Sequence, residues 1–441
     1  MKMIEGVEVP EGWRRLKLGE VAHSLKSGGT PSRDVLEFWG GNVPFVLIED
    51  MTKTNKYLIS TNETISEKGL KNSSAWIVPK YSILLSMYAS LGEVVINKID
   101  VATNQAILGI ILKKDYNLEF MYYILRFNKR NYEKYTIQTT QKNLNKELVS
   151  QIFIRIPISL PEQHKIAEIL GTVDNAIERT DTIIEKYKRI KQGMMQDLLT
   201  RGVVENDELG VMNYVLRDEK KHKFKDSPLG RIPEEWVVVE LGGVAKKLKS
   251  GGTPSRDILD YWDGDIPFAL IEDLTKNKYL DSTNETITEK GLKKSSAWIV
   301  PKNSILLSMY ASLGEVVINK INVATNQAIL GIILKEVYDL EFVYYLLKFN
   351  KSNYEKYTIQ TTQKNLNKKI VSEFIISVPS SLSEQRKIAE ILESIDNAIE
   401  KEQKYKEKVE RIKQGLMDDL LTGKVRVKYL IEGGAENVQQ A

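Results

Sequence analysis

The chain has 441 residues, 42% of them apolar, and its 63 basic and 59 acidic residues leave a net charge of +4. This length allows two or three domains with their own cores. So small a net charge neither requires nor excludes nucleic-acid binding, which depends on local basic patches. The lack of cysteine excludes disulfides, thiolate metal sites and a cysteine nucleophile. There is no signal-peptide pattern and no run of roughly 18 apolar residues, so we expect a cytoplasmic protein that does not cross a membrane.

One module is written twice in this chain. The letters SGGTPSRD occupy residues 27–34 and return at residues 250–257. Residues 55–112 match residues 277–334 at 53 of 58 positions without a gap. Because each copy spans about 190 residues, the repeat is a duplicated module and not a solenoid of short units.

The first part of each module has the composition of a sheet. Residues 119–135 show helical spacing and are expected to pack on that sheet. Short apolar runs typical of strands alternate with Gly, Pro and Asn, at residues 43–48, 75–79, 82–88, 93–99 and 106–112.

The second part of each module is a predicted long helix. From Pro161 onward, apolar residues follow a heptad seam. A helix over residues 162–199 would be about 57 Å long, and its apolar stripe needs a partner. The alternative is that each helix folds back on its own domain. We predict instead that the two helices pair through Ile166, Ile169, Val173, Ile177, Ile184, Ile190, Ile388, Ile391, Ile395, Ile399, Val409 and Ile412.

The predicted fold class is α/β, in the α+β sense. Two globular, sheet-containing domains are joined by two long antiparallel helices in a pseudo-two-fold arrangement. The expected boundaries are 1–160 for the first domain, 161–200 for its helix, 201–227 for a charged linker, 228–382 for the second domain, 383–424 for its helix and 425–441 for a tail.

No catalytic constellation is visible. Lys246 and Arg386 replace His23 and His164 in the second copy, and His222 lies in the linker. A duplicated active site would not depend on residues that one copy lacks. Phosphate-binding glycine loops and the nucleophile elbow are also absent. We therefore predict no catalytic residues and no metal ligands.

A repeated pair of carboxylates leaves three interpretations open. Glu49-Asp50 recurs as Glu272-Asp273 at the end of a predicted strand. Such a pair could bind a metal, could accept a hydrogen bond from cytosine, or could form a strand-end turn or salt bridge. We favour the turn or salt bridge, because no third ligand has suitable spacing.

Two polar loops carry hydrogen-bonding groups suited to DNA. Residues 103–105 and 138–145 are dense in Asn, Gln and Thr, and Lys142 lies within the second. Asn and Gln can pair with adenine, Arg can pair with guanine, and Lys binds phosphates. The same residue types also cap helices and fill turns, so the cap interpretation stays open for each residue.

Several motifs resemble the specificity subunit of type I restriction–modification enzymes. They are SPLGRIPEEW at 227–236, GGTPSRD with W-x-G and IPF behind it at 251–268, ATNQA at 102–106 and 324–328, and EQ-x-x-IAEIL-x-x-x-DNAI at 162–177 and 384–399. The resemblance covers nearly the whole chain, in the order recognition domain, helix, recognition domain, helix.

The resemblance implies a non-catalytic protein with two target-recognition domains, each reading half of a bipartite site in double-stranded DNA. The helices would set the gap between the halves and dock two methyltransferase subunits, which restriction subunits join. S-adenosylmethionine, ATP and magnesium would be bound by those partners, with no cofactor in this chain. The implied DNA-binding residues are Thr30, Ser32, Arg33, Tyr88, Ser90, Asn104, Gln105, Gln138, Thr140, Gln141, Lys142 and Asn143, with Thr253, Ser255, Arg256, Tyr310, Ser312, Asn326, Gln327, Gln360, Thr362, Gln363, Lys364 and Asn365 in the second copy.

One departure from the family changes the expected target. Family members usually carry two different recognition domains, whereas the two domains here are nearly the same. With antiparallel helices, the target would be an interrupted palindrome; with parallel helices, it would be a direct repeat. Two alternatives remain, namely a metal-dependent DNA-modifying or DNA-cleaving enzyme that uses the paired carboxylates, and a coiled-coil protein scaffold.

Overall fold

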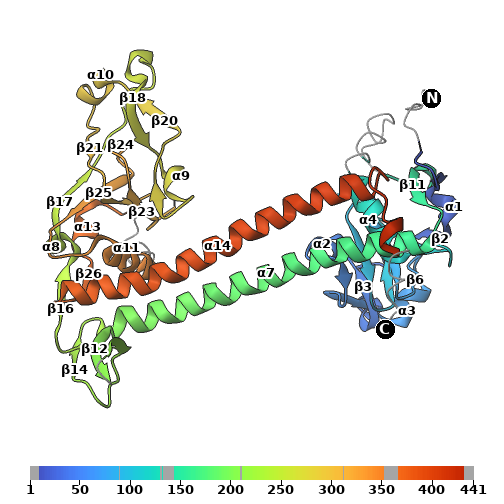
Figure 1. The fold of residues 1–441 in the computed structure, drawn as a ribbon, viewed down its shortest axis with the longest axis horizontal. Helices are drawn as coiled ribbons and strands as arrows, with labels where there is room; N and C mark the ends of the chain where they lie inside the picture. The colour runs from blue at the N-terminus through green and yellow to red at the C-terminus, as the bar shows by residue number, and fades with distance from the viewer. Residues whose placement is uncertain are drawn as a thin grey trace. The chain divides into compact units, whose positions relative to one another are not determined.

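The chain forms two compact units that share the long helices. The first unit is Met1–Asp181 with Lys404–Ala441, and the second unit is Thr182–Gln403. Each unit therefore contains one recognition domain with half of each helix, which Figure 1 shows as continuous coils. The computed structural model describes residues 9–88, 90–129, 132, 144–208, 211–310, 312–351 and 366–431.

Among the described residues, the domain of the first unit contains three sheets. Their strand orders are β2-β10-β7-β8-β4, β5-β3-β9-β6 and β1-β11. The elements are β1 (Trp13–Lys17), α1 (Leu18–Val21), β2 (Ala22–Ser27), η1 (Leu36–Phe38), β3 (Trp39–Val46), α2 (Ile48–Thr52), β4 (Tyr57–Leu58), β5 (Glu63–Ile65), α3 (Glu67–Lys71), β6 (Ile77–Val78), β7 (Ser82–Ser86), β8 (Val94–Asn97), β9 (Val101–Thr103), β10 (Ile107–Leu112), α4 (Leu118–Phe127), α6 (Lys146–Gln151) and β11 (Phe153–Pro157).

The second unit repeats this topology. Its sheets have the orders β17-β25-β22-β23-β19, β20-β18-β24-β21 and β16-β26. The elements are β16 (Trp236–Glu240), α8 (Leu241–Val244), β17 (Ala245–Ser250), η2 (Leu259–Tyr261), β18 (Trp262–Ala269), α9 (Ile271–Leu274), β19 (Tyr279–Leu280), β20 (Glu285–Ile287), α10 (Glu289–Lys293), β21 (Ile299–Val300), β22 (Ser304–Ser308), β23 (Val316–Asn319), β24 (Val323–Thr325), β25 (Ile329–Leu334), α11 (Leu340–Phe349), α13 (Lys368–Ser372) and β26 (Ile375–Pro379).

The central strand β7 carries buried apolar residues on both of its faces. Ile83 and Leu85 pack in one core cluster with Phe120 of α4, while Leu84 packs in another with Val101 of β9. Successive residues of a strand point to opposite faces, so β7 separates the two cores. The five-stranded sheet is therefore covered by helix on one face and by the four-stranded sheet on the other.

Ion pairs fix the direction of the long helices, α7 (Leu160–Thr200) and α14 (Leu382–Leu420). In the first unit Asp174 pairs with Lys413 (2.5 Å) and Asp181 with Lys406 (2.6 Å). As residue numbers increase along α7, the numbers of their partners on α14 decrease, so the helices are antiparallel. In the second unit Lys191 pairs with Asp396 (2.5 Å), and the end of α7 packs with the start of α14. The prediction of antiparallel pairing is confirmed within each unit.

The predicted seam between the helices is only partly correct. Ile184 and Val409 are buried, but Ile190 and Ile412 are 39% and 47% exposed. Ile166 is buried in the core of the first recognition domain, and Ile388 in that of the second. The apolar stripe is wider than one partner helix can cover, so heptad position alone did not predict burial. The other predicted seam residues are half-buried, namely Ile169, Val173, Ile177, Ile391, Ile395 and Ile399.

Residues 201–227 do not form the charged linker that the sequence predicts. This segment folds with the residues after it into two hairpins, β12 (Val203–Glu208) with β13 (Val211–Leu216) and β14 (Phe224–Ser227) with β15 (Gly230–Pro233). One of its charges is buried, because Arg217 donates to both oxygens of Glu384 at the start of α14.

The predicted tail also begins inside the fold. Nε and Nη2 of Arg426 donate to the carboxylate of Glu162 at the start of α7, at 2.7 and 2.9 Å. Val427 is buried in the first domain's core. The two arginines thus occupy corresponding places, each following the end of one helix and binding the start of the other.

We predict that Glu384→Ala lowers the free energy of unfolding by about 3–5 kcal/mol, because it leaves Arg217 buried without its carboxylate. Glu390→Ala removes the exposed partner of Lys387 and is the matched control, with an expected cost below about 1 kcal/mol. Urea unfolding followed by tryptophan fluorescence measures both. Equal midpoints for the two variants would contradict the buried pair.

Candidate nucleic-acid interface

Three loops of each domain meet at one end of the five-stranded sheet. Ser27, the last residue of β2, is paired with Leu108, and Ser86, the last residue of β7, is paired with Ile107. The loops 28–33, 87–92 and 104–106 therefore lie together at this end of the sheet, which we call the loop edge. The Gly28 amide donates to the Asn104 carbonyl (3.0 Å), and the Met87 amide donates to the Ala106 carbonyl (2.8 Å).

The second unit builds the same edge. The Gly251 amide donates to the Asn326 carbonyl (3.1 Å), and the Met309 amide donates to the Ala328 carbonyl (2.8 Å). The structure thus brings together loops that lie apart in the sequence, such as those of Gly251 and Asn326, which are 75 residues apart.

Close packing explains the first glycine of the repeated motif. A Cβ on Gly28 would lie 1.7 Å from the Thr103 carbonyl oxygen, and a Cβ on Gly251 would lie 1.7 Å from that of Thr325. No side chain fits there, so the loop lies directly on the end of β9 in the first unit and on that of β24 in the second.

Threonine and glutamine form one exposed polar pair at each edge. The Thr30 hydroxyl donates to Oε1 of Gln105 (3.1 Å), and the Thr253 hydroxyl donates to Oε1 of Gln327 (2.9 Å). This bond fixes the oxygen of each carboxamide. A carboxamide in a known orientation is suited to reading a base edge.

The arginine of the motif is already bound to a carboxylate within its own domain. Nη1 and Nη2 of Arg33 donate to the carboxylate of Glu63 (3.0 and 2.8 Å), and the guanidinium stacks 3.7 Å from the centre of the Trp39 ring. Arg256 makes the same contacts with Glu285 and with Trp262 (3.8 Å). A two-pronged contact with guanine would require each arginine to leave its carboxylate.

The asparagine of each ATNQA motif is part of a turn. Oδ1 of Asn104 accepts from the Ala106 amide (2.8 Å), and Oδ1 of Asn326 accepts from the Ala328 amide (2.9 Å). The turn interpretation is therefore confirmed for this side-chain oxygen. Among the remaining predicted residues of the described loops, Ser32, Ser255 and Ser312 are exposed, and Tyr88, Ser90 and Tyr310 are half-buried.

Ten predicted DNA-binding residues lie outside the described residues: Gln138, Thr140, Gln141, Lys142, Asn143, Gln360, Thr362, Gln363, Lys364 and Asn365. The chain that follows each segment returns to the loop edge. The Leu144 amide donates to the Met87 carbonyl (3.1 Å), and the Leu366 amide donates to the Met309 carbonyl (3.0 Å).

Exposed lysines near the loop edge were missed from the sequence. Lys26 Nζ lies 5.2 Å from the centre of the Trp76 ring, and Lys247 and Lys249 flank Trp298 at 4.7 and 5.6 Å. These lysines belong to β2 and β17, the strands that lead into the motif loops. Their alternation with apolar residues was the available signal, because it marks the solvent face of a strand.

The repeated carboxylates form a turn. Oδ2 of Asp50 accepts from the Leu47 amide (2.8 Å), and Asp273 does the same for Leu270 (3.0 Å). Glu49 pairs with Lys53 (2.5 Å). This confirms the turn and salt-bridge interpretation. No group of three or more His, Cys, Asp or Glu within the described ranges is arranged to hold a metal.

The fold and the sequence agree on one class of protein. Residues 10–189 and 233–411 each match the family model described as type I restriction modification DNA specificity domain. The chain therefore carries two DNA specificity domains and belongs to the family of type I restriction enzyme specificity subunits, which are not the catalytic subunits. In the described part of the chain, no helix has the length and apolar character needed to cross a membrane.

Two archaeal relatives match most of the chain. The MjaIX specificity subunit of Methanocaldococcus jannaschii is 35% identical over 355 residues, which are 78% of this chain and 77% of the relative. The MjaVIII specificity subunit of the same organism is 28% identical over 442 residues, covering 97% of this chain and 96% of the relative.

Two solved structures share the fold. The crystal structure of the S subunit of a type I restriction–modification system from M. genitalium superposes with a TM-score of 0.56 at 16% identity, covering 95% of this chain and 98% of that one. A chain from a study of complex assembly and conformational transition of the type I system gives 0.58 at 16% identity, covering 95% of this chain and all of that one.

We predict that Gly28→Ala combined with Gly251→Ala lowers the free energy of unfolding by about 1–3 kcal/mol, because each Cβ collides with a backbone oxygen. Gly193→Ala with Gly415→Ala is the matched control, since a Cβ at either helix position meets nothing within 4 Å. The control should stabilise the chain, as alanine favours helix by up to ~1 kcal/mol over glycine. Urea titration gives both values, and a loop variant as stable as the parent would show that the loops are not tightly seated.

Proposed function

We propose that this chain reads both halves of a bipartite DNA site with the loop edges of its two five-stranded sheets. The observation that carries the proposal is that the two units present the same three loops with the same hydrogen bonds. A DNA specificity protein needs a reader for each half-site, and the duplicated edges supply two.

The chemistry of each edge suits a reader. Gln105 and Gln327 are exposed, and each is oriented by a threonine, so the amide group is placed to face a base edge. The lysines on β2 and β17 add positive charge on the strands beside the motif loops, where phosphates would lie. Arg33 and Arg256 are held by carboxylates, so we assign them to shaping the loop before DNA arrives.

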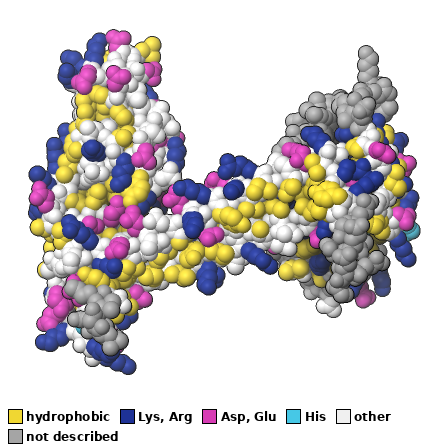
Figure 2. All heavy atoms as spheres, in the orientation of Figure 1, with side chains coloured by type: hydrophobic (Ala, Val, Ile, Leu, Met, Phe, Trp, Pro, Cys, Tyr) yellow, Lys and Arg dark blue, Asp and Glu magenta, His cyan; other side chains and the backbone are white. Residues whose placement is uncertain are grey.

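The long helices offer a docking surface in each unit. Tyr405 and Ile412 in the first unit are 50% and 47% exposed, and Ile183 and Ile190 in the second are 40% and 39% exposed. Each pair is spaced by seven residues and occupies the same place in its repeat. Figure 2 shows hydrophobic side chains exposed along these helices. Such apolar pairs on helices suit helical partners, and we assign one methyltransferase subunit to each pair.

The partner subunits would carry the chemistry. We assign S-adenosylmethionine to the methyltransferase subunits and ATP with magnesium to the restriction subunits, as the family resemblance implies. This chain would supply the sequence specificity and hold the partners together in the cytoplasm.

The form of the target follows from the repeat. Near-identical edges should read the same letters, and for two readers joined by antiparallel helices we propose half-sites that are inverted repeats of each other. The target is then a short half-site, an unread gap and the reverse complement of that half-site.

The test is to assemble the chain with its methyltransferase and sequence the methylated positions on genomic DNA. We expect an interrupted palindrome, and no methylation or cleavage by the isolated chain. Two unrelated half-sites would contradict the symmetric readers, and a direct repeat would contradict the inverted arrangement.

We predict that Tyr405→Ser with Ile412→Ser weakens the binding of one methyltransferase by roughly a hundredfold, because two apolar side chains lose their burial at the interface. Ile183→Ser with Ile190→Ser should remove the other methyltransferase. Native mass spectrometry would then show one methyltransferase per chain for either pair. Lys186→Ser with Lys408→Ser changes two exposed residues at matching places and should leave two bound. If either of the first two double variants still bound two methyltransferase subunits, this surface would not be the docking site.

A further inference from the structure

One hydrogen-bonded chain joins the recognition domain to both long helices in each unit. In the second unit Tyr345 of α11 donates to Oδ2 of Asp396 on α14 (2.7 Å), and Lys191 of α7 pairs with the other oxygen of Asp396 (2.5 Å). In the first unit Tyr123 donates to Asp174 (2.6 Å), which pairs with Lys413. This connection is the same in the two units.

The second unit has an additional bridge at this junction. Glu393 of α14 accepts from the hydroxyl of Tyr279 (2.8 Å) and from Lys278 Nζ (3.2 Å). Tyr279 and Lys278 also contact Glu341 of α11, at 2.9 and 2.6 Å. The start of strand β19 is therefore tied to its own domain and also directly to the long helix.

Glu393 is charged when it makes this bridge. Burial raises the pKa of Glu393, but the hydrogen bonds from Tyr279 and Lys278 outweigh it, so the pKa lies below its ordinary value. Hydrogen bonds to a charged acceptor are about twice as strong as neutral ones.

The first unit has a glycine where Glu393 stands in the second. Gly171 holds the corresponding place in α7, four residues after Ala167 in a motif that otherwise matches. Tyr57, the counterpart of Tyr279, donates to Glu119 of its own domain (2.5 Å). Gly171 has no side chain to reach Tyr57 or Lys56, and glycine is a poor helix former.

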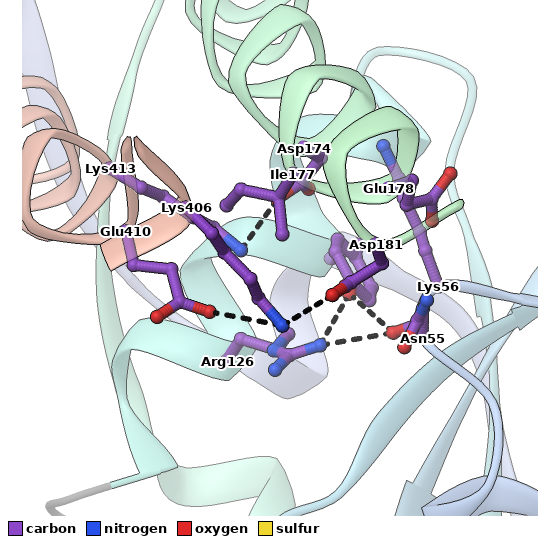
Figure 3. A pocket seen from close by; sticks show the side chains of 11 residues that line it. Asn55, Lys56, Arg126, Asp174, Ile177, Glu178, Asp181, Lys406, Glu410 and Lys413 are labelled. Atoms are coloured by element: carbon purple, nitrogen blue, oxygen red, sulfur yellow. Dashed lines mark hydrogen bonds and ion pairs between the residues drawn. The ribbon is translucent and has the colours of Figure 1, made fainter. Parts of the chain in front are cut away.

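The surroundings of Gly171 leave the junction loosely filled. A Cβ there would meet only the Tyr123 hydroxyl, at 3.8 Å. Nearby, between α4, α7 and α14, is a cavity of about 230 Å³. Figure 3 shows that Lys406 and Lys413 in this cavity point toward carboxylates of the helix pair. Its lining residues include Asn55, Lys56, Arg126, Asp174, Asp181 and Glu410.

We propose that Glu393 is a positioning residue that fixes the second recognition domain on its long helix, and that Gly171 leaves the first domain able to tilt. The inference rests on the proposed function. The two recognition domains would then read the same bases but differ in how much change in the gap between half-sites they accept. The second domain sets the register on DNA, and the first adapts when this gap changes by one base pair.

The first experiment measures the junction without DNA. In the full chain, amide hydrogen exchange should be roughly fivefold faster in residues 160–181 than in residues 382–403. Gly171→Glu should remove this difference by slowing exchange in residues 160–181, and Glu393→Gly should remove it by speeding exchange in residues 382–403. Gly171→Ala and Glu393→Ala are the controls, since they restore helix propensity without the bridge. Equal exchange in the parent segments, or equal effects of alanine and glutamate at residue 171, would overturn the proposal.

The second experiment measures how the methylation rate depends on the gap between half-sites. The assembled methyltransferase complex is given duplexes with the native gap, one base pair fewer or one more. Gly171→Glu should lower the methylation rate on the altered gaps by roughly tenfold relative to the native gap, and Glu393→Gly should raise it. Glu393→Gln keeps an acceptor for Tyr279 and should retain part of the parent's selectivity. If these ratios do not move, Glu393 does not position the reader. If no duplex is methylated, the proposed function fails, while the exchange measurement still decides the role of Glu393 at the junction.

Discussion

Two arginine–glutamate pairs hold the ends of the long helices, and in each pair the glutamate is buried. Arg217 follows the end of α7 and binds Glu384 at the start of α14; Arg426 follows the end of α14 and binds Glu162 at the start of α7. Breaking a buried ion pair costs far more than an exposed one. The helix ends also share positive-φ glycines, Gly202 (φ 64°) and Gly423 (φ 76°), a conformation that lets the chain turn toward its arginine.

Within each domain, the packed sheets give the recognition loops a rigid support. Each five-stranded sheet lies between helix and second sheet, and each domain is held to both long helices through a tyrosine and an aspartate. The loop edges are short and carry polar side chains on a fully packed base. A site built on rigid elements can place a carboxamide against a base more accurately than one built on long loops.

Much of this was predictable from the sequence, because periodicity and repetition are local signals. The helix predicted from residue 161 runs over Leu160–Thr200, and the paired carboxylates at Asp50 form a turn as expected. The errors came from long-range contacts. Arg217 was placed in a charged linker because its partner lies 167 residues away, and the bond between Arg33 and Glu63 was not predicted because Glu63 is distant in sequence. Ile190 and Ile412 kept heptad spacing on a face that the partner helix does not cover.

The division of the chain affects the order in which it can fold during synthesis. The second unit, Thr182–Gln403, is one continuous stretch, so all of its contacts are available before residues 404–441 are made. The first unit must wait for Lys404–Ala441, because Leu420, Leu421 and Val427 complete its core. Until then Ile166 and Leu170 lack part of their packing, and the nascent chain exposes apolar surface. A ribosome that stops early would therefore release a finished second reader beside an unfinished first one.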